Sequence, residues 1–242
     1  MRIILSGALG KMGKQVKEIL LRRGDKIIEI DGLFSGKTAN CKCEGKNAEE
    51  CGNCPEFNKF ADFSDITAHA DAIIDFSAPA LTLKAARYAL KTQTPLVIGT
   101  TGLNEDCLIK IKEVSEIAPV CVSGNFSPAV CAYIKAAKLL SENLSGYDAV
   151  ISETHHKEKR DAPSGTAAAI ARELKTPVKT VSMRGGTVCG VHETHFFGEN
   201  DEITLIHRAY SRKIFAEGAV KCARELIKKP AGLYKAEDLL FN

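Results

Sequence analysis

The chain has 242 residues, of which 45% are hydrophobic and 26% are charged, and its formal net charge at pH 7 is +3. This composition is ordinary for a globular protein, and so small a net charge gives no support for nucleic-acid binding. The sequence has no run of about 18 apolar residues, and its short apolar start, Met1–Leu5, leads directly into a glycine loop. We therefore expect a cytoplasmic protein with no signal peptide, no membrane partner and no nucleic-acid partner.

Residues 1–31 have the pattern of one βαβ unit. A β-branched run at Arg2–Ser6 is followed by a glycine-rich loop and then by apolar residues at helical spacing between Met12 and Leu20. A second apolar run, Lys26–Ile30, ends at Asp31. A strand, a glycine turn, a helix and a second strand in this order predict the start of a parallel sheet.

Strands and helices continue to alternate as far as Val122, after a polar, cysteine-rich stretch at Gly32–Phe60 that has no clear period and predicts a long loop. Apolar runs predict strands at 72–76, 95–98 and 120–122, with helices between them. This alternation favours a parallel sheet with helices on both faces, in which ligands bind at the carboxyl ends of the strands.

The pattern changes after residue 126. A long helix is predicted at Ala129–Leu144, a strand at Ala149–Ser152 and a helix from Ser164, followed by strand-like runs near 179–183, 192–197 and 202–207 with no helix between them. The stretch from Ser211 is helical again. We therefore predict an α/β fold: a Rossmann-like parallel-sheet domain (1–126 and 211–242) for a dinucleotide, plus a second α+β domain with a mixed sheet (127–210) for substrate binding and oligomerisation.

The first loop has the spacing GxxGxxG instead of the usual dinucleotide pattern GxGxxG, so by itself it also fits a glycine turn without a ligand. Its place between the first strand and a helix favours a dinucleotide site, because glycines let a pyrophosphate approach the backbone at the helix N-terminus. The predicted cofactor contacts in this loop are Gly7, Gly10, Lys11, Met12 and Gly13.

Asp31, at the end of the second strand, can accept hydrogen bonds from both adenosine ribose hydroxyls and would repel a 2′-phosphate. The cofactor is therefore NADH or NADPH, with NADH slightly favoured, because Arg2, Lys11 and Lys37 can offset the repulsion. Gly99, Thr100 and Thr101 follow a later strand, where the nicotinamide half is expected, although an ordinary strand-to-helix turn explains them equally well.

The segment Glu153–Thr166 combines two adjacent histidines, His155 and His156, with several cations and a helix start. Ser164 is a good N-cap, so the amides of Gly165 and Thr166 are available to a carboxylate. This pattern predicts a site for a small acidic substrate that needs charge pairing and a proton. Two plainer interpretations are a solvated charged loop and a fragment of a metal site, for which no third ligand stands at a recognisable spacing.

Nine cysteines are present, and without an export signal disulfides are a poor explanation. Five are scattered among apolar neighbours and are interpreted as small buried residues. The other four form a CxC and a CxxC pair that would suit a structural zinc ion or remain reduced thiols, and we assign no metal site: Cys41, Cys43, Cys51 and Cys54.

Several motifs occur together over nearly the whole chain: GALGKMG, IDFSAP, IGTTG, SGNFSPAV, ETHHKEKRDAPSGTA, SRKIFAEGAVKCA and a closing GLY. In these motifs the chain resembles the 4-hydroxy-tetrahydrodipicolinate reductase family, also called dihydrodipicolinate reductase, of the diaminopimelate route to lysine. The most specific motif is HHxxK followed by DAPSGT.

The resemblance implies that a hydride passes from NADH or NADPH to a cyclic imine with two carboxylates, and that a proton completes the reduction. His155 corresponds to the family's proposed proton-transfer residue and Lys159 to its general acid. His156, Gly165 and Thr166 correspond to substrate contacts. The resemblance also implies a homotetramer joined through the second domain's sheet, and it implies cofactor contacts at Gly7, Lys11, Met12, Asp31, Gly99, Thr101, Ser123, Asn125 and Phe126.

The stretch Cys41–Cys54 departs from the family pattern, and its position after Asp31 leaves the choice between NADH and NADPH open. One alternative is another amino-acid-pathway dehydrogenase, such as a homoserine or aspartate dehydrogenase, which would share the glycine loop but lack HHxxK. A second alternative is a non-catalytic NAD-binding redox sensor that uses the clustered cysteines as a switch.

Overall fold

The structure is a computed structural model that describes residues 1–32 and 59–241. These residues divide into two compact units, unit 1 (Met1–Ser123 and Ala216–Asn242) and unit 2 (Gly124–Phe215). The predicted functional division at 126/127 and 210/211 remains a prediction. Lys37 and the four clustered cysteines lie outside the described residues. Within the described residues, no helix has the length and hydrophobicity that a membrane crossing requires.

Unit 1 contains a seven-stranded sheet in which every pair of neighbouring strands is parallel. The central pair is β1 (Arg2–Ser6) and β4 (Ala72–Asp75), and the full strand order is β11-β6-β5-β4-β1-β2-β3. Strands β2 and β3 lie on one side of β1, and the chain then crosses to the other side to form β4. The carboxyl ends of β1 and β4 therefore form a topological switch point. The other strands are β2 (Lys26–Ile30), β3 (Lys59–Phe60), β5 (Leu96–Ile98), β6 (Pro119–Val122) and β11 (Gly232–Tyr234).

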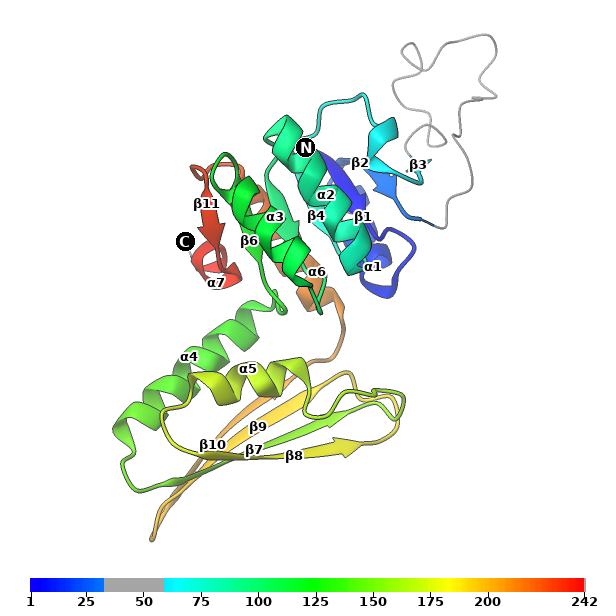
Figure 1. The fold of residues 1–242 in the computed structure, drawn as a ribbon. Helices are drawn as coiled ribbons and strands as arrows, with labels where there is room; N and C mark the ends of the chain where they lie inside the picture. Colours follow the sequence, from blue (N-terminus) through cyan, green and yellow to red (C-terminus); the bar gives the residue numbers. More distant parts are fainter. Residues whose placement is uncertain (33–58, 242) are drawn as a thin grey trace. The chain divides into compact units, whose positions relative to one another are not determined.

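Helices cover both faces of this sheet (Figure 1). Helices α2 (Pro79–Thr92) and α3 (Glu105–Ser115) pack on one face over a core that includes Ile4, Ile73 and Leu96, each fully buried. Helices α1 (Lys11–Arg22) and α6 (Lys213–Leu226) lie on the other face. A short 3-10 helix, η2 (Phe63–Asp65), and a terminal helix, α7 (Ala236–Leu240), complete the described part of the unit. The Rossmann-like part of the prediction is confirmed.

Unit 2 contains a four-stranded sheet of order β10-β9-β7-β8. Helix α5 (Gly165–Glu173) connects β7 to the parallel strand β8, whereas β9 runs antiparallel to both β7 and β10. The sheet is therefore mixed, as predicted. Helix α4 (Pro128–Asn143) packs beside α5 on one face, over a core that includes Ile151 and Phe196. The strands are β7 (Asp148–His155), β8 (Val178–Arg184), β9 (Val191–Phe197) and β10 (Glu202–Arg208).

Several details of the elements differ from the prediction. Strand β7 does not end at Ser152 but continues to His155, because each of its residues from Ala149 onward pairs with β8 and the alternation of buried and half-buried side chains persists. Strand β11 was not predicted, since three residues are too few to show a period. The last long helix begins at Lys213, two residues after the predicted start.

We expect Gly13→Ala to destabilise unit 1 by on the order of 1–3 kcal/mol. A Cβ atom at Gly13 would lie 2.1 Å from the backbone oxygen of Gly7, and backbone cannot rotate away as a side chain can. Gly32→Ala is the matched control, because its Cβ would meet no atom of the described residues within 4 Å. Thermal melting followed by circular dichroism measures both variants, and equal melting temperatures would contradict the proposed close packing of the glycine loop.

Candidate functional site

The glycine loop closely crosses the ends of two neighbouring strands. Gly7 has φ +78 and donates its N–H to the carbonyl of Ile30 at 2.8 Å. A Cβ atom at Gly7 would lie 2.3 Å from the carbonyl oxygen of Phe76, which follows β4. Only glycine combines this backbone conformation with this approach, so the loop lies directly at the switch point of the sheet.

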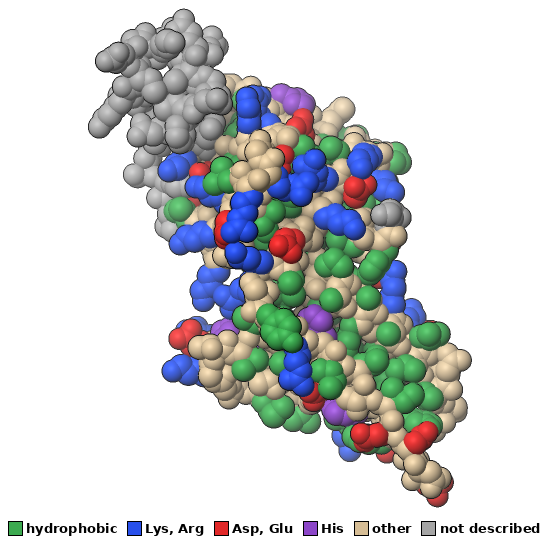
Figure 2. Space-filling view, turned by 180° about the vertical axis from the view of Figure 1, so that it is seen from behind, with side chains coloured by type: hydrophobic (Ala, Val, Ile, Leu, Met, Phe, Trp, Pro, Cys, Tyr) green, Lys and Arg blue, Asp and Glu red, His purple; other side chains and the backbone are tan. Residues whose placement is uncertain are grey.

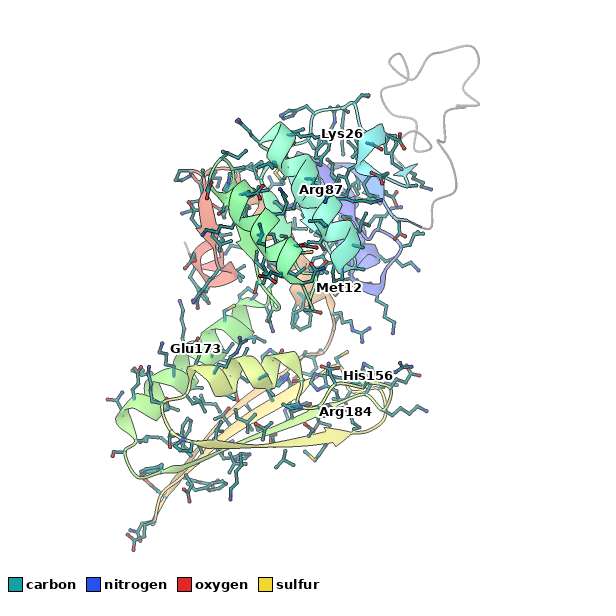
Figure 3. All side chains as sticks on the ribbon, viewed as in Figure 1. Met12, Lys26, Arg87, His156, Glu173 and Arg184 are labelled. Carbon is teal, nitrogen blue, oxygen red and sulfur yellow. The ribbon has the colours of Figure 1, made fainter. Side chains whose placement is uncertain are left out.

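The N-terminus of α1 has the features of an anion site. Its N-cap is Gly10, which offers no side-chain cap, and the first turn contains no acidic residue (Figure 3 labels Met12 there). Lys11 is exposed at this point. Unsatisfied amides, the positive end of the helix dipole and a nearby ammonium group together suit a pyrophosphate.

Asp31 lies beside this loop, where its Oδ2 atom accepts the backbone N–H of Leu9 at 3.0 Å. Arg2, by contrast, begins β1, and its guanidinium donates to the carbonyl of His69. The length of β1 therefore separates Arg2 from Asp31, and the idea that Arg2 offsets the charge of Asp31 is wrong. The same role for Lys11 remains a prediction, and Lys37 lies outside the described residues.

Thr100 has a structural role inside unit 1. Its hydroxyl donates to Asp75, which is fully buried, at 2.7 Å and accepts the N–H of Ser77 at 2.9 Å. Asp75 also accepts from the hydroxyls of Ser77 and Thr82, so a buried carboxylate is satisfied by neutral donors. The hydroxyl of Thr100 is therefore already engaged by Asp75 and Ser77, and a cofactor would have to share it with them.

The neighbours of Thr100 differ in exposure. A Cβ atom at Gly99 would overlap the ring of Phe76 at 2.1 Å, which explains the glycine by packing. Thr101 is exposed and remains available to a ligand. Gly99 and Thr101 both follow β5, at the carboxyl edge where the cofactor contacts were expected.

The Ser123–Phe126 stretch continues from β6 into unit 2. Asn125 accepts the N–H of Ser127 at 2.8 Å and donates to the Thr166 hydroxyl at 3.3 Å. Phe126 as a whole is 1% exposed, so it has almost no free surface for a cofactor contact.

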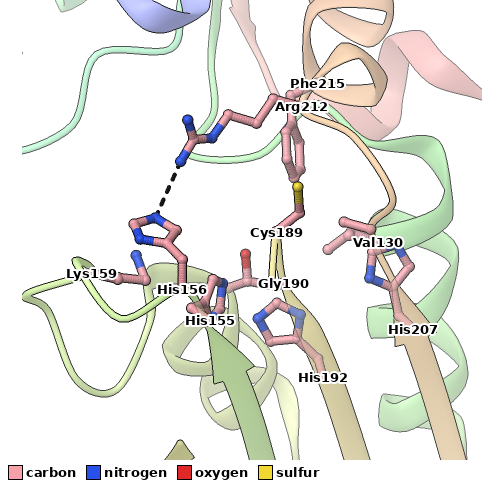
Figure 4. A pocket seen from close by; sticks show the side chains of 12 residues that line it. Val130, His155, His156, Lys159, Cys189, Gly190, His192, His207, Arg212 and Phe215 are labelled. Carbon is pink, nitrogen blue, oxygen red and sulfur yellow. Dashed lines mark hydrogen bonds between the residues drawn. The ribbon is translucent and has the colours of Figure 1, made fainter. Parts of the chain in front are cut away.

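Unit 2 contains a cavity of about 180 Å³, which suits a small ligand (Figure 4). Four predicted residues line it: His155, His156, Lys159 and Thr166. No carboxylate is among its described lining residues. Sequence reasoning missed its other walls, which come from the start of α4, the segment before β9, strands β9 and β10, the segment after β10 and the start of α6: Val130, Cys189, Gly190, His192, His207, Ala209, Arg212 and Phe215.

Three imidazoles approach this cavity from three neighbouring strands. His192 on β9 pairs in register with Glu153 on β7 and with His207 on β10, so these side chains lie on the same sheet face. The ring centroids of His155 and His192 are 5.1 Å apart, and those of His192 and His207 are 6.2 Å apart. The predicted catalytic residues His155 and Lys159 thus line the same cavity as two histidines, His192 and His207, that no local motif indicated.

A buried ion pair lies beneath His155. The carboxylate of Glu153 receives two hydrogen bonds from Arg184, at 2.8 and 2.9 Å, and also accepts the N–H of Ser164. The fourth contact joins Glu153 Oε2 to the Nδ1 atom of His155 at 2.5 Å. Burial opposes ionisation, but hydrogen bonds from Arg184, from Ser182 and from His155 lower the pKa of Glu153 to about 2.

Burial favours the neutral form of three imidazoles at the cavity, those of His155, His192 and His207. Burial first, and then the neighbouring His155 and His207, lower the pKa of His192 to about 4. Burial also lowers the pKa of His155, against an opposing effect of Glu153, and the pKa of His207. At neutral pH the positive charge at this cavity therefore comes from Lys159 and Arg212, not from these rings.

The cationic side chains lie on loops around the cavity. The ammonium group of Lys159 is 2.8 Å from both carboxylate oxygens of Asp161, whose side chain is 59% exposed. Arg212 donates to the Nε2 atom of His156 at 3.2 Å (Figure 4). Because an exposed ion pair contributes little stability, an anionic ligand can take Lys159 from Asp161 at small cost.

The start of α5 contributes backbone donors. Ser164 caps the helix by accepting the N–H of Ala167 at 3.2 Å, and its hydroxyl also contacts the Nε2 atom of His192. The N–H groups of Gly165 and Thr166 donate to no described residue, as expected for the first turn of a helix. These amides and the side chains of Lys159 and His156 together provide the donors that a carboxylate needs.

No described group of three or more His, Cys, Asp or Glu residues is arranged to hold a metal ion. Of the five described cysteines, four are buried as interpreted from the sequence. Cys189 is the exception, because it is partly exposed and lines the cavity. The choice between a structural zinc ion and reduced thiols at Cys41, Cys43, Cys51 and Cys54 falls outside the described residues.

Comparison with known proteins gives a consistent result along the chain. The family profile described as dihydrodipicolinate reductase, N-terminus, matches residues 1–126, and the profile described as dihydrodipicolinate reductase, C-terminus, matches residues 129–240. The 4-hydroxy-tetrahydrodipicolinate reductase of Rickettsia rickettsii is 34% identical over 99% of this chain and 98% of its own length. The enzyme of the same name from Campylobacter jejuni is 33% identical over the same shares.

Among solved structures, the dipicolinate-bound dihydrodipicolinate reductase from Paenisporosarcina sp. TG-14 has the same fold. It superposes with a TM-score of 0.75, at 22% sequence identity, over 97% of each chain. A probable dehydrogenase from Thermotoga maritima superposes with a TM-score of 0.60 at 11% identity, over 99% of this chain and 92% of its own.

We expect the neutral state of buried His192 to make the fold less stable in weak acid. In the unfolded chain this imidazole takes up a proton below about pH 6.5, whereas in the fold it does so only near pH 4. Above about pH 6.5 the protonation of His192 therefore leaves the free energy of unfolding unchanged. As the pH falls from there toward 4, it lowers this free energy by up to about 1.4 kcal/mol per pH unit.

Urea unfolding at several pH values between about 7.5 and about 4.5 measures this slope in the wild type and in His192→Gln. The variant should show a shallower dependence of the free energy of unfolding on pH. The low pKa of Glu153 acts in a separate window, below its ordinary value of 4.5. Identical slopes for the two proteins would contradict the neutral state of His192.

Proposed function

The chain belongs to the dihydrodipicolinate reductase family, also called 4-hydroxy-tetrahydrodipicolinate reductase, and from that membership we propose how its two units perform the reaction. The reaction is the NAD(P)H-dependent reduction of 4-hydroxy-tetrahydrodipicolinate to tetrahydrodipicolinate in lysine biosynthesis. This family membership replaces the two alternatives, another amino-acid-pathway dehydrogenase and a redox sensor.

The substrate site of this proposal is the cavity of unit 2. The observation that carries it is the set of donors around that cavity: two cationic side chains, the amides at the start of α5 and no carboxylate among the described lining residues. A ring with two carboxylates matches these donors in charge and in hydrogen bonding. His156, Gly165 and Thr166 hold the carboxylates, and Lys159 leaves Asp161 to pair with the ring.

His155 and Lys159 carry the proton chemistry. Hydride addition to the conjugated imine places negative charge on the ring, and a nearby ammonium group stabilises that charge as it forms. Lys159 is the general acid, because its ammonium group lines the cavity and can give up a proton, which the guanidinium of Arg212 cannot do. His155 takes up a proton at its Nε2 atom when the anionic substrate binds, and can then pass that proton on. The Nδ1 atom of the same ring is already engaged by Glu153.

The cofactor site is at the carboxyl edge of the unit 1 sheet. A reduced nicotinamide nucleotide bound there supplies the hydride. The amides at the start of α1 and the side chain of Lys11 receive the pyrophosphate, and Thr101 stands at the end of β5 for the nicotinamide half. The N–H of Leu9 holds the carboxylate of Asp31 beside the loop, where it can accept hydrogen bonds from the ribose hydroxyls. The same carboxylate would repel a 2′-phosphate, so it slightly favours NADH.

We also propose a homotetramer joined through the sheet of unit 2, in the cytoplasm. Helices α4 and α5 cover one face of this sheet, and no described helix covers the other (Figure 1). Apolar side chains reach the surface of unit 2 (Figure 2), and those on the uncovered face are Val181, Met183, Phe197 and Ile206, each between 39% and 52% exposed. A face of this kind is typical of an interface between subunits.

The proposed reaction is tested by a coupled assay. The substrate is generated enzymatically in place, purified protein is added, and oxidation of NADH and of NADPH is followed side by side. We expect turnover with both, and a several-fold higher kcat/KM for NADH because Asp31 repels the 2′-phosphate. No oxidation of either nucleotide would contradict the function, and a preference for NADPH would contradict the role of Asp31.

We expect Lys159→Ala to reduce kcat by a factor on the order of 100 to 10,000, with little change in the affinity for the nicotinamide cofactor. The reason is that Lys159 belongs to unit 2, whereas the proposed cofactor contacts at the glycine loop belong to unit 1. Lys157→Ala is the matched control, because Lys157 is an exposed lysine of the same segment that does not line the cavity. Wild-type turnover by the Lys159 variant would contradict its assignment.

A further inference from the structure

We propose that Glu153, together with Arg184, is a positioning residue that fixes the proton of the His155 ring on Nδ1 and presents its Nε2 atom to the cavity as a hydrogen-bond acceptor. Neither Glu153 nor Arg184 lines the cavity, so both act through His155. The catalytic consequence rests on the proposed function, whereas the state of the ring does not.

The direction of the Glu153–His155 hydrogen bond follows from the charge of the acceptor. Glu153 is ionised at neutral pH, since hydrogen bonds from Arg184 and from two further side chains outweigh burial and hold its pKa at about 2. An ionised carboxylate only accepts, so the atom 2.5 Å away, His155 Nδ1, must be the donor. A neutral imidazole with its proton on Nδ1 carries a lone pair on Nε2.

The surroundings of the Nε2 atom explain why it can serve a ligand. A Cβ atom at Gly190 would lie 3.0 Å from Nε2 of His155, so a larger residue there would press against the nitrogen edge of the ring. Gly190 and His155 both line the cavity. The glycine directly before β9 thus leaves the acceptor atom accessible.

Arg184 moderates the effect of Glu153 on the ring. A carboxylate alone would raise the pKa of His155, but Arg184 neutralises that carboxylate through two hydrogen bonds, and burial lowers the pKa. Lys159 on the following loop lowers the pKa of His155 as well, and His192 faces the ring from β9. His155 therefore stays neutral until an anionic ligand joins these groups.

Arg184 also connects this pair to the segment that carries Lys159. Its guanidinium donates to the backbone carbonyls of Lys159 at 3.3 Å and Asp161 at 2.6 Å. Figure 3 places Arg184 and His156 at the same end of the unit 2 sheet. One buried ion pair thus sets both the tautomer of His155 and the path of the loop that carries Lys159. The two catalytic side chains therefore differ: His155 is a neutral hydrogen-bond acceptor, and Lys159 is a cationic donor.

The test uses the full chain without ligand, by NMR titration of its six histidines, with the His155 signals assigned from a His155→Asn variant. Nitrogen shifts at high pH report the tautomer, and we expect Nδ1 protonated and Nε2 bare. Glu153→Gln should shift the titration of His155 to lower pH, and Arg184→Gln should shift it to higher pH. Glu158→Gln, an exposed acid of the same segment, should shift nothing.

Opposite shifts distinguish the proposal from a merely structural brace, which would give shifts of the same sign or none. Arg184→Lys keeps the charge and should restore most of the wild-type titration even if Arg184→Gln folds poorly. Nε2-protonated His155 in the wild type, or equal shifts in both variants, would overturn the proposal.

In the coupled assay we expect Glu153→Gln to lower kcat by a factor on the order of 100, with a smaller change in the KM of the substrate. An inactive wild type would defeat the proposed function while leaving the NMR result standing. A wild-type kcat in the variant would overturn the positioning role.

Discussion

The ion pair between Glu153 and Arg184 is the interaction on which the cavity of unit 2 depends. The carboxylate is 1% exposed, and removing one partner of such a pair typically costs about 3–5 kcal/mol because a buried charge is left uncompensated. This pair holds the end of β7, the end of β8, the Lys159 loop and the cap of α5 in one arrangement. The ring of His155 and the amides of α5 are directed by the same carboxylate.

The charge pattern of the cavity follows from this arrangement. Burial favours the neutral form of His155, His192 and His207, and Arg184 cancels the charge of Glu153. The side chains of Lys159 and Arg212 supply positive charge at the cavity. A dianionic ligand would meet fixed donors and a set of neutral rings that can take up protons. The site thus gains part of its positive charge only when an anionic ligand binds, because the ligand's negative charge favours protonation of the neutral rings.

Much of the fold and part of the site could be predicted from the sequence. The βαβ start, the sheet of unit 1 and the helix cap at Ser164 are local patterns, and the sequence shows them directly. The HHxxK segment was found because its residues are adjacent. His192, His207 and Arg184 were missed, because they join His155 only through strand register, which depends on long-range pairing that no local spacing reveals. The alternation of side chains along the strand that contains His192 was the available signal, because it places His192 on the buried face of that strand.

The structure also separates packing roles from ligand roles among the predicted cofactor residues. Gly7 and Gly99 are required by close approach to Phe76, and Thr100 is required by the buried Asp75. Sequence spacing cannot distinguish a glycine that makes room for backbone from one that makes room for a phosphate. Gly10 and Lys11, at the uncapped start of α1, remain the residues best suited to contact a pyrophosphate.

The central claim is that the cavity of unit 2 holds neutral imidazoles that gain protons when a dianionic ring binds beside Lys159. Calorimetric titration of the wild-type protein with dipicolinate at about pH 7.5, in buffers of different ionisation enthalpy, measures the protons exchanged on binding. The account predicts measurable affinity together with net proton uptake, because the ligand's negative charge raises the pKa of the neighbouring rings. Binding without proton uptake, or with proton release, would contradict it.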